Sequence, residues 1–158
     1  MHDAGLKAGI TIRMAGSDDC AAIGALAAQL GYQSFAEQIA QRLRYFSPSN
    51  ERNLLVAGMP SGEIVGWIGM YVVRTISSDA RLEISGLVVD EKHRSHKVGA
   101  LLLKRAEEWG AARGLNEVSV HANAIRERAH RFYEQHGYHL EKTQKVFRKA
   151  LGGGHEKC

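Results

Sequence analysis

The chain of 158 residues has little proline, little cysteine and no long apolar run. Its two prolines, Pro48 and Pro60, fall at apparent loops. Its two cysteines, Cys20 and Cys158, form neither a CxxC pair nor a zinc-ligand spacing, so a reducing cytosol fits and we expect no metal site. No apolar run approaches the roughly 20 residues of a membrane-spanning helix, and no secretion signal opens the chain. We therefore expect a cytoplasmic protein that has no membrane partner.

The composition is that of an ordinary globular protein, with 44% hydrophobic and 24% charged residues. The length predicts a single domain over residues 10–150, an N-terminal extension of residues 1–9 and a flexible C-terminal tail of residues 151–158. The formal net charge is +4, and basic residues are densest in 92–97 and 126–131. This charge fits a bound phosphorylated cofactor, and it fits a solvated basic surface equally well.

The hydrophobic periodicity predicts a mixed α/β (α+β) fold with a central sheet flanked by helices. Apolar residues alternate or form β-branched runs in the expected strands 10–15, 53–59, 64–76, 81–89 and 117–121. Apolar residues recur at helical spacing in the expected helices 20–30, 34–46, 98–113 and 126–136. With a final strand or hairpin in 138–148, the element order is β-α-α-β-β-β-α-β-α-β, and its three consecutive strands predict an antiparallel meander.

Residues 83–104 contain the most informative local pattern, a strand that runs through a basic loop directly into a helix. The first N–H groups of a helix have no intrahelical acceptor, so such a junction suits a pyrophosphate. Arg94 and Lys97 add positive charge there, and Gly99 permits a close backbone approach. An ordinary loop with solvated basic side chains remains the alternative. Neither GxxxxGK[ST] nor GxGxxG after a strand occurs, which argues against a kinase-type or dinucleotide site.

Two segments together resemble the GNAT acetyltransferase superfamily. GLVVDEKHRSHKVGALLL (86–103) resembles motif A of that family, and its loop pattern [Q/R]-x-x-G-x-[G/A] falls on residues 94–99. RERAHRFYEQHGY (126–138) resembles motif B, with matches at Ala129, Phe132, Tyr133, Gly137 and Tyr138. IVGWI (64–68) resembles the third strand of the family. The resemblance covers nearly all of residues 10–150.

The resemblance implies transfer of an acetyl group from acetyl-CoA to a primary amine by direct attack in a ternary complex. Backbone groups of Leu87, Val88 and Val89 would hold the pantetheine arm like an added strand. The pyrophosphate would be held by backbone amides of the loop and first helical turn, namely Arg94, Ser95, His96, Lys97, Val98, Gly99 and Ala100. This chain departs from the family pattern where Lys97 replaces a loop glycine and where Arg126 replaces the asparagine that often contacts the cofactor arm.

The same resemblance suggests catalytic groups. An alkylamine arrives protonated, since its pKa is about 10.4, so a base is needed, and Glu83 matches the frequent catalytic glutamate of the family. In an unbulged strand Glu83 would share a face with Ser85 and Leu87. Tyr133 matches the motif B tyrosine that often protonates the leaving thiolate, and an amide near Val88 would meet the oxyanion. The alternatives are a solvent-facing carboxylate for Glu83 and a core aromatic for Tyr133.

The acceptor stays open at this stage. A small amine or amino acid, an aminoglycoside-like polycation and a protein amine all fit the family, and Tyr32, Tyr45 and Tyr71 are candidates to line its site. Segments 29–46 and 71–80 carry more arginines than acids, which favours an acceptor of low charge or an anionic one. A non-catalytic acyl-CoA sensor on the same fold is the second hypothesis. We expect no nucleic-acid partner, because the pI of about 9.2 is the sole feature that suggests one. Homodimers are common among similar proteins, so we expect one here.

Overall fold

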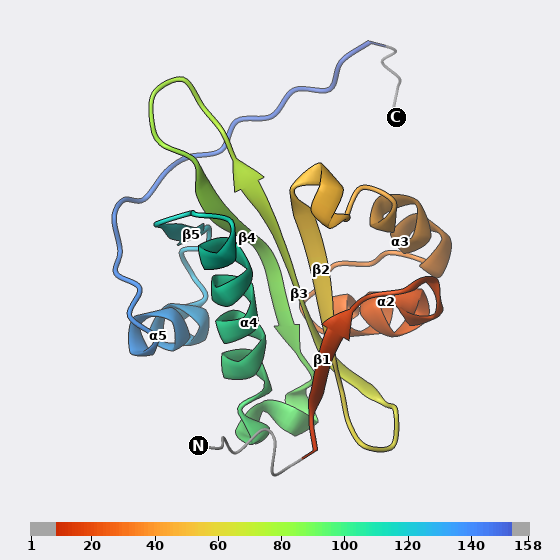
Figure 1. The fold of residues 1–158 in the computed structure, drawn as a ribbon. Helices are drawn as coiled ribbons and strands as arrows, with labels where there is room; N and C mark the ends of the chain where they lie inside the picture. The colour runs from red at the N-terminus through yellow and green to blue at the C-terminus, as the bar shows by residue number, and fades with distance from the viewer. Residues whose placement is uncertain (1–8, 153–158) are drawn as a thin grey trace. The chain divides into compact units, whose positions relative to one another are not determined.

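The computed structural model describes residues 9–152, which form two compact units (Figure 1). The first unit is residues 1–121 and the second is residues 122–158. Most of the expected N-terminal extension, residues 1–8, and most of the expected tail, residues 153–158, lie outside the described residues. Each unit is considered by itself below.

The first unit contains every strand of the described chain. The strands are β1 (Thr11–Met14), β2 (Arg52–Gly58), β3 (Ile64–Val73), β4 (Arg81–Val89) and β5 (Val118–Val120). The helices of this unit are α2 (Cys20–Ala28), α3 (Ala36–Leu43) and α4 (Val98–Ala112), with short 3-10 turns η1 (Ser17–Asp19), η2 (Pro48–Asn50) and η3 (Glu91–His96). The elements predicted for this unit are therefore all present, and the expected basic loop is wound into η3.

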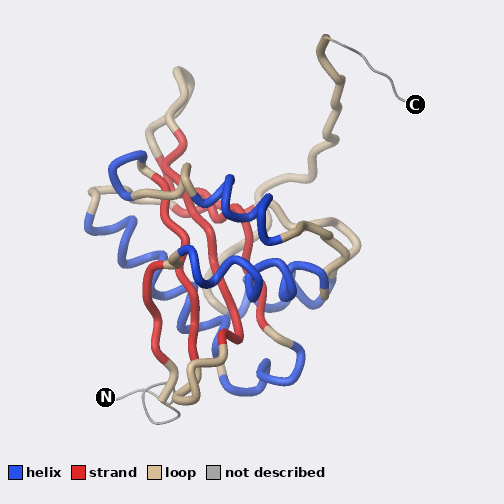
Figure 2. Tube along the Cα trace, turned by 90° about the vertical axis from the view of Figure 1, so that its right-hand side faces the viewer, coloured by secondary structure: helices blue, strands red, loops and turns tan. Residues whose placement is uncertain are grey.

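The strands form one sheet in the order β1-β2-β3-β4-β5, and they lie side by side in Figure 2. Strands β1 to β4 pair antiparallel, which confirms the predicted meander, and β5 pairs parallel with β4. Helix α4 packs on one face, where a Cβ on Gly66 would lie 3.1 Å from side-chain atoms of both Val98 and Leu102. Helices α2 and α3 cover the other face.

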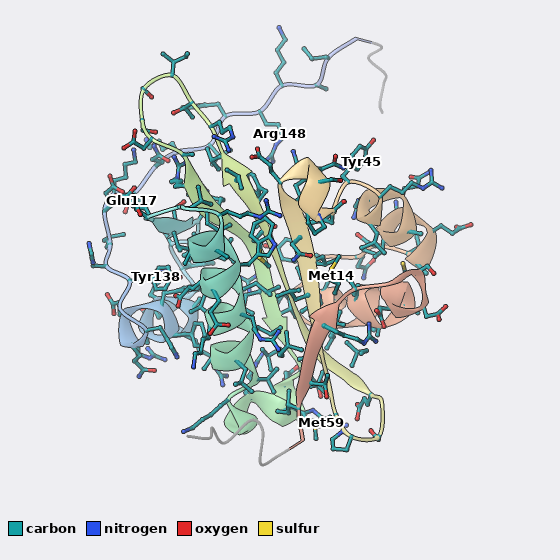
Figure 3. The ribbon with its side chains drawn as sticks, in the orientation of Figure 1. Met14, Tyr45, Met59, Glu117, Tyr138 and Arg148 are labelled. Atoms are coloured by element: carbon teal, nitrogen blue, oxygen red, sulfur yellow. The ribbon has the colours of Figure 1, made fainter. Side chains whose placement is uncertain are left out.

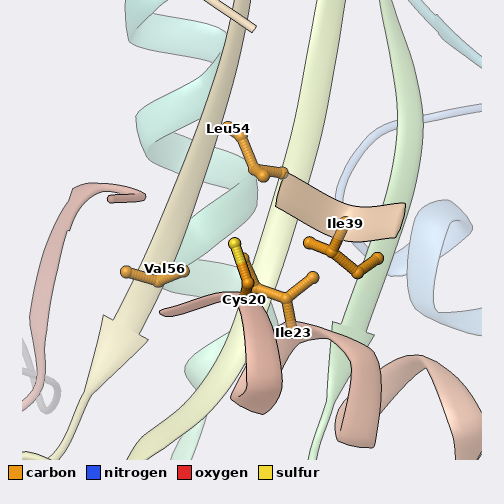
Figure 4. Packing of buried hydrophobic residues seen from close by; sticks show 5 residues of the cluster. All are labelled: Cys20, Ile23, Ile39, Leu54 and Val56. Atoms are coloured by element: carbon orange, nitrogen blue, oxygen red, sulfur yellow. The ribbon is translucent and has the colours of Figure 1, made fainter. Parts of the chain in front are cut away.

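The core on the α2 and α3 face joins these helices to β2. Its buried members are Cys20, Ile23, Ile39, Leu54 and Val56, which point toward one another in Figure 4. Each of its isoleucine, leucine and valine side chains contributes about 1.5–3 kcal/mol of hydrophobic free energy when it is fully buried. The sheet is thus held rigidly between two helical layers, which fixes the positions of the polar side chains along its strands.

A β-bulge in β4 changes which side chains share a face. The register of β3 and β4 shifts between Gly69 and Met70, because Gly69 pairs with Gly86 while Met70 pairs with Ile84, leaving Ser85 as an extra residue. The extra residue reverses the alternation beyond it. Glu83 therefore shares its face with Gly86 and Val88. The expected grouping of Glu83 with Leu87 is wrong for this reason.

The second unit contains α5 (Glu127–Gln135), which confirms the predicted helix 126–136. The expected strand or hairpin in 138–148 is wrong, because residues 139–150 carry no secondary structure and their side chains are exposed. Charged residues are spread through this segment, so it lacks the apolar face that a half-buried strand requires. Among the described residues no strand forms a ladder with it.

Candidate active site

A row of polar side chains crosses four strands of the sheet. The register pairs Arg52 of β2 with Tyr71 of β3, Tyr71 with Glu83 of β4, and Glu83 with Ser119 of β5. Neighbouring strands are about 4.8 Å apart, so the backbones of Arg52 and Glu83 are separated by about 10 Å. This row lies on the face that α2 and α3 cover, beside their apolar core.

Glu83 is the buried centre of this row. Only 2% of the residue is exposed, and both of its carboxylate oxygens have partners. The hydroxyl of Ser119 donates to Oε1 at 2.5 Å, and the Arg81 guanidinium lies 3.8 Å from the same oxygen. Nδ1 of His121 lies 2.7 Å from Oε2. A buried carboxylate needs such partners, so Ser119 of β5, His121 just after it and Arg81 of β4 make Glu83 tolerable in the sheet.

Tyr71 and Arg52 extend the site away from Glu83. Burial, reinforced by the nearby charge of Glu83, raises the pKa of the Tyr71 phenol. The guanidinium of Arg52 lies 5.4 Å from the centre of the Tyr71 ring, a cation–π distance. Tyr71 therefore lies beside the carboxylate. Tyr32 and Tyr45 are instead exposed residues next to α2 and α3, and Tyr45 is labelled in Figure 3.

One edge of β4 is open beyond the short ladder with β5. The two strands pair only over Leu82 to Ile84. The amide of Leu82 donates to the carbonyl of Glu117, toward β5, and the amide of Asp90 donates to the carbonyl of Val65, toward β3. Backbone direction alternates along a strand, so Leu87 and Val89 direct their N–H and C=O groups toward the open edge. Those of Val88 point to β3 instead.

The loop after β4 ends in an unusual backbone conformation. Lys97 has φ 60° and ψ 26°, the left-handed region that glycine adopts most easily. The resemblance places a glycine at this position, and Lys97 adopts a conformation that glycine allows while adding a positive charge. The first helical bond of α4 runs from the Leu101 amide to the Lys97 carbonyl, which leaves the amides of Val98, Gly99 and Ala100 without an acceptor inside the helix.

A small hydrogen-bond network anchors the start of this loop to α2. The Gln29 side chain donates to Asp90 at 2.8 Å and accepts from the Glu91 amide at 3.2 Å. Nδ1 of His93 lies 2.6 Å from the other Asp90 oxygen. Hydrogen bonds from Gln29 and His93 lower the pKa of the Asp90 carboxyl. These bonds hold the start of the loop in place. The half-buried Arg94 follows in η3, and the loop then continues to Lys97.

The motif B residues belong to the second unit. Burial raises the pKa of Tyr133 to about 12, so its phenol is protonated at neutral pH. Its ring contacts Phe132 and Tyr138 edge-on, with centroid distances of 5.2 and 5.6 Å. Arg126 is the residue before α5, and its amide donates to the carbonyl of Asn123 at 3.0 Å. The helix thus holds Tyr133 among aromatic neighbours. This arrangement is compatible with either role considered for Tyr133, a proton donor or a core aromatic residue.

Ser119 and His121 are functional candidates that the sequence reasoning missed. The segment EVSVH (117–121) alternates, so residues 119 and 121 share one strand face, but the strand that this face would meet depends on the parallel pairing with β4. That pairing joins residues 36 positions apart in the chain.

Among the described residues, no group of three potential metal ligands gathers. No described helix has the length and apolar character needed to span a bilayer.

Comparisons with known proteins agree with the fold and the motifs. The model of the Acetyltransferase (GNAT) family matches residues 18–138. Aminoalkylphosphonate N-acetyltransferase of Salmonella typhimurium strain LT2 is 32% identical over 124 residues, which cover 78% of this chain and 76% of that protein.

Solved structures share the fold at lower identity. Aminoglycoside 6'-N-acetyltransferase AAC(6')-Ih from Acinetobacter baumannii matches with a TM-score of 0.77 and 17% identity, over 91% of this chain and 100% of that chain. Aminoglycoside N-acetyltransferase AAC(6')-Iy in complex with CoA matches with a TM-score of 0.77 and 16% identity, over 90% of this chain and 95% of that chain. Together with the family match and the curated relative, this shows that the chain is an acyltransferase of the GNAT acetyltransferase family.

Proposed function

We propose that the protein transfers an acetyl group from acetyl-CoA to the primary amine of a small molecule, by direct attack in a ternary complex. The observation that carries this proposal is the buried carboxylate of Glu83, which lies on β4 just before the bulge and the open edge. A buried carboxylate and a strand edge free to bind an extended ligand therefore lie on the same strand.

The described residues of this strand and loop fit acetyl-CoA. Leu87 and Val89 offer N–H and C=O groups at the open edge, where an amide-bearing pantetheine arm would add like a strand. The unpaired amides at the start of α4 and the positive charge of Lys97 suit the pyrophosphate. Lys97 replaces glycine in a left-handed conformation that glycine also allows. Bound acetyl-CoA would supply an activated thioester.

The candidate oxyanion donors on β4 differ in whether their amides face β3 or the open edge of the strand. The sequence resemblance places this donor near Val88, but the Val88 amide belongs to the ladder with Trp67 of β3. An amide that is already paired gains little by meeting a developing charge. We therefore propose the amide of Leu87, the open-edge residue nearer Glu83, as the donor for the thioester oxygen. The Leu87 carbonyl and the Val89 groups then remain for the pantetheine arm.

Tyr133 is proposed as the proton donor to the leaving sulfur. Its phenol remains protonated because burial raises its pKa to about 12. A thiol has an ordinary pKa of about 8.5, so the phenol is the weaker acid and would donate a hydrogen bond to the departing sulfur. Its partner on motif B, Arg126, replaces the usual asparagine and offers a charge for the cofactor arm.

The acceptor is proposed to carry an anionic group beside its amine. The relative from Salmonella typhimurium is named for aminoalkylphosphonates, which have such a pair of charges. On the sheet of this chain, Arg52 lies in the same row as Glu83 and, among the described residues, has no carboxylate partner. Arg74, by contrast, is bound to Glu51 at 2.7 Å. An ammonium near Glu83 and an anion near Arg52 would match this row.

An aminoglycoside acceptor is the second candidate, because two of the structural neighbours are aminoglycoside acetyltransferases. Their identity to this chain is 17% and 16%, so they share its fold without specifying its acceptor. A polycation would also meet the positive charge of Arg52, which disfavours it by charge repulsion.

The experiment is an acceptor panel with acetyl-CoA, in which thiol release is followed. It compares an aminoalkylphosphonate, the alkylamine of equal length without the phosphonate, an aminoglycoside and a lysine peptide. We expect the highest kcat/KM for the aminoalkylphosphonate, and a selective loss of that preference in Arg52→Gln. Acetyl-CoA binding without turnover of any amine would favour the sensor hypothesis. Preference for the aminoglycoside would contradict the proposed acceptor.

A further inference from the structure

The side chain of Glu83 is badly placed to take a proton from a substrate by itself. Its Oε1 accepts from Ser119 and lies near Arg81, and its Oε2 is engaged by His121. Only 3% of the side chain is exposed. A general base must lie within hydrogen-bond reach of the proton that it removes, so a base with a free and accessible lone pair is needed.

His121 offers such a lone pair. Its side chain is 73% exposed, while its Nδ1 lies 2.7 Å from Oε2 of the buried Glu83. A carboxylate can only accept, so this contact requires a proton on Nδ1. In the neutral ring the lone pair is then on Nε2, the nitrogen farther from Glu83. The protein thus presents one imidazole nitrogen in a defined protonation state.

We propose that Nε2 of His121 is the proton acceptor for the incoming amine and that Glu83 is its positioning residue. This inference rests on the proposed N-acetyltransferase function and names a catalytic residue that the family motifs do not contain. Ser119 and Arg81 hold the carboxylate in place from the other side. The arrangement follows the general logic in which a carboxylate orients an imidazole and stabilises the imidazolium that forms.

The proton balance of the reaction is complete without another reactant. The substrate ammonium gives one proton to Nε2 of His121, and the freed lone pair on nitrogen forms the new C–N bond. The C–S bond breaks, and its electron pair remains on sulfur. The nitrogen loses its second proton, the sulfur gains one proton, and the imidazolium returns its own to water. One proton is therefore released for each acetyl group transferred.

The charged and titratable groups around His121 come from three strands. Glu83 and Arg81 on β4 lie closest to it, and Tyr71 and Arg52 continue the row on β3 and β2. A protonated imidazole has no lone pair with which to accept a proton, so turnover through His121 requires its neutral form.

The first test replaces His121 by asparagine, whose side-chain amide can still donate to Glu83 but cannot accept a proton. We expect kcat/KM to fall by about 100-fold or more, with loss of the acidic limb of the pH profile and an unchanged Kd for acetyl-CoA. Added imidazole should restore part of the activity of His121→Ala. His139→Asn, at an exposed histidine of the second unit, is the matched control. A His121→Asn enzyme within about threefold of the native rate overturns the proposal.

The second test does not depend on turnover. Nitrogen-15 NMR of the histidine rings should show His121 with its proton on Nδ1 in the native protein, and a loss of this bias in Glu83→Gln. A neutral His121 with its proton on Nε2 in the native protein overturns the inference. Failure of the proposed function would look different, because the native protein would then turn over no amine while the Nδ1–H form remained.

Discussion

Glu83→Gln removes the charge of the central carboxylate while it keeps the shape of the side chain. The new amide can keep its C=O toward His121 and turn its NH2 toward Ser119. The Ser119 hydroxyl already accepts from Arg81 at 2.9 Å, has a second lone pair, and can redirect its own proton to the Leu82 carbonyl at 3.5 Å. Every group therefore keeps a partner, and only the charge assistance of the Ser119 hydrogen bond and of the 2.7 Å contact with His121 is lost.

The loss of stability follows from that count. A hydrogen bond to a charged group contributes about 1.5–3 kcal/mol and a neutral one about 0.5–1.5 kcal/mol, so each bond loses about 1 kcal/mol. The bond to the exposed His121 loses less through solvent screening, which gives a total of about 1–2 kcal/mol. In a chain of this length the midpoint of thermal unfolding should fall by about 2–8 °C.

The loss of activity should be far larger than the loss of stability. Without the carboxylate, His121 has neither its fixed tautomer nor a counter-charge, so kcat/KM should fall by about 100-fold or more. Thermal unfolding and thiol release are measured on the same preparations. Glu117→Gln, the same change at an exposed glutamate just before β5, is the control and should change neither quantity. Turnover within threefold of the native rate in Glu83→Gln would refute the reasoning.

Three further variants test other parts of the site and fold. Lys97→Glu should weaken acetyl-CoA binding about tenfold in calorimetry, whereas Lys104→Glu, an equal charge change at an exposed residue of α4, should not. Tyr133→Phe should lower kcat at least about tenfold with acetyl-CoA affinity retained. Because folding raises the pKa of the Tyr133 phenol, the free energy of unfolding of the native protein should decline as the pH rises from about 10 toward 12. Asp19→Ala removes a buried carboxylate that binds Arg13 at 2.8 and 2.9 Å, and should cost about 2 kcal/mol in denaturant unfolding at pH 7. Because Arg13 lowers the pKa of Asp19, that difference should shrink below about pH 4.

Local patterns in the sequence predicted the elements that depend on local chemistry. The alternation of 81–89 and the helical spacing after Val98 each give the element observed, since burial periodicity is a property of neighbouring residues. The helix expected over 34–46 is shorter, Ala36–Leu43, and it begins where the Phe35 amide donates to the Gln38 side chain.

Features that depend on pairing between distant segments escaped the sequence reasoning. The bulge at Ser85 follows from the register of β3 against β4, and it moves Leu87 to the opposite face from Glu83. Ser119 and His121 reach Glu83 only because β5 adds in parallel to β4. The residues after Tyr138 could not be assigned correctly, since a strand exists only when another edge accepts its hydrogen bonds.

The central claim is that acetyl-CoA binds along the open edge of β4 and the loop at Lys97. Calorimetric titration of the purified protein with acetyl-CoA, with free CoA in parallel, tests it most directly. The structure predicts micromolar binding of one acetyl-CoA per chain, because the loop keeps its left-handed conformation at Lys97 and the amides of α4 remain available. No binding at millimolar acetyl-CoA would contradict the account.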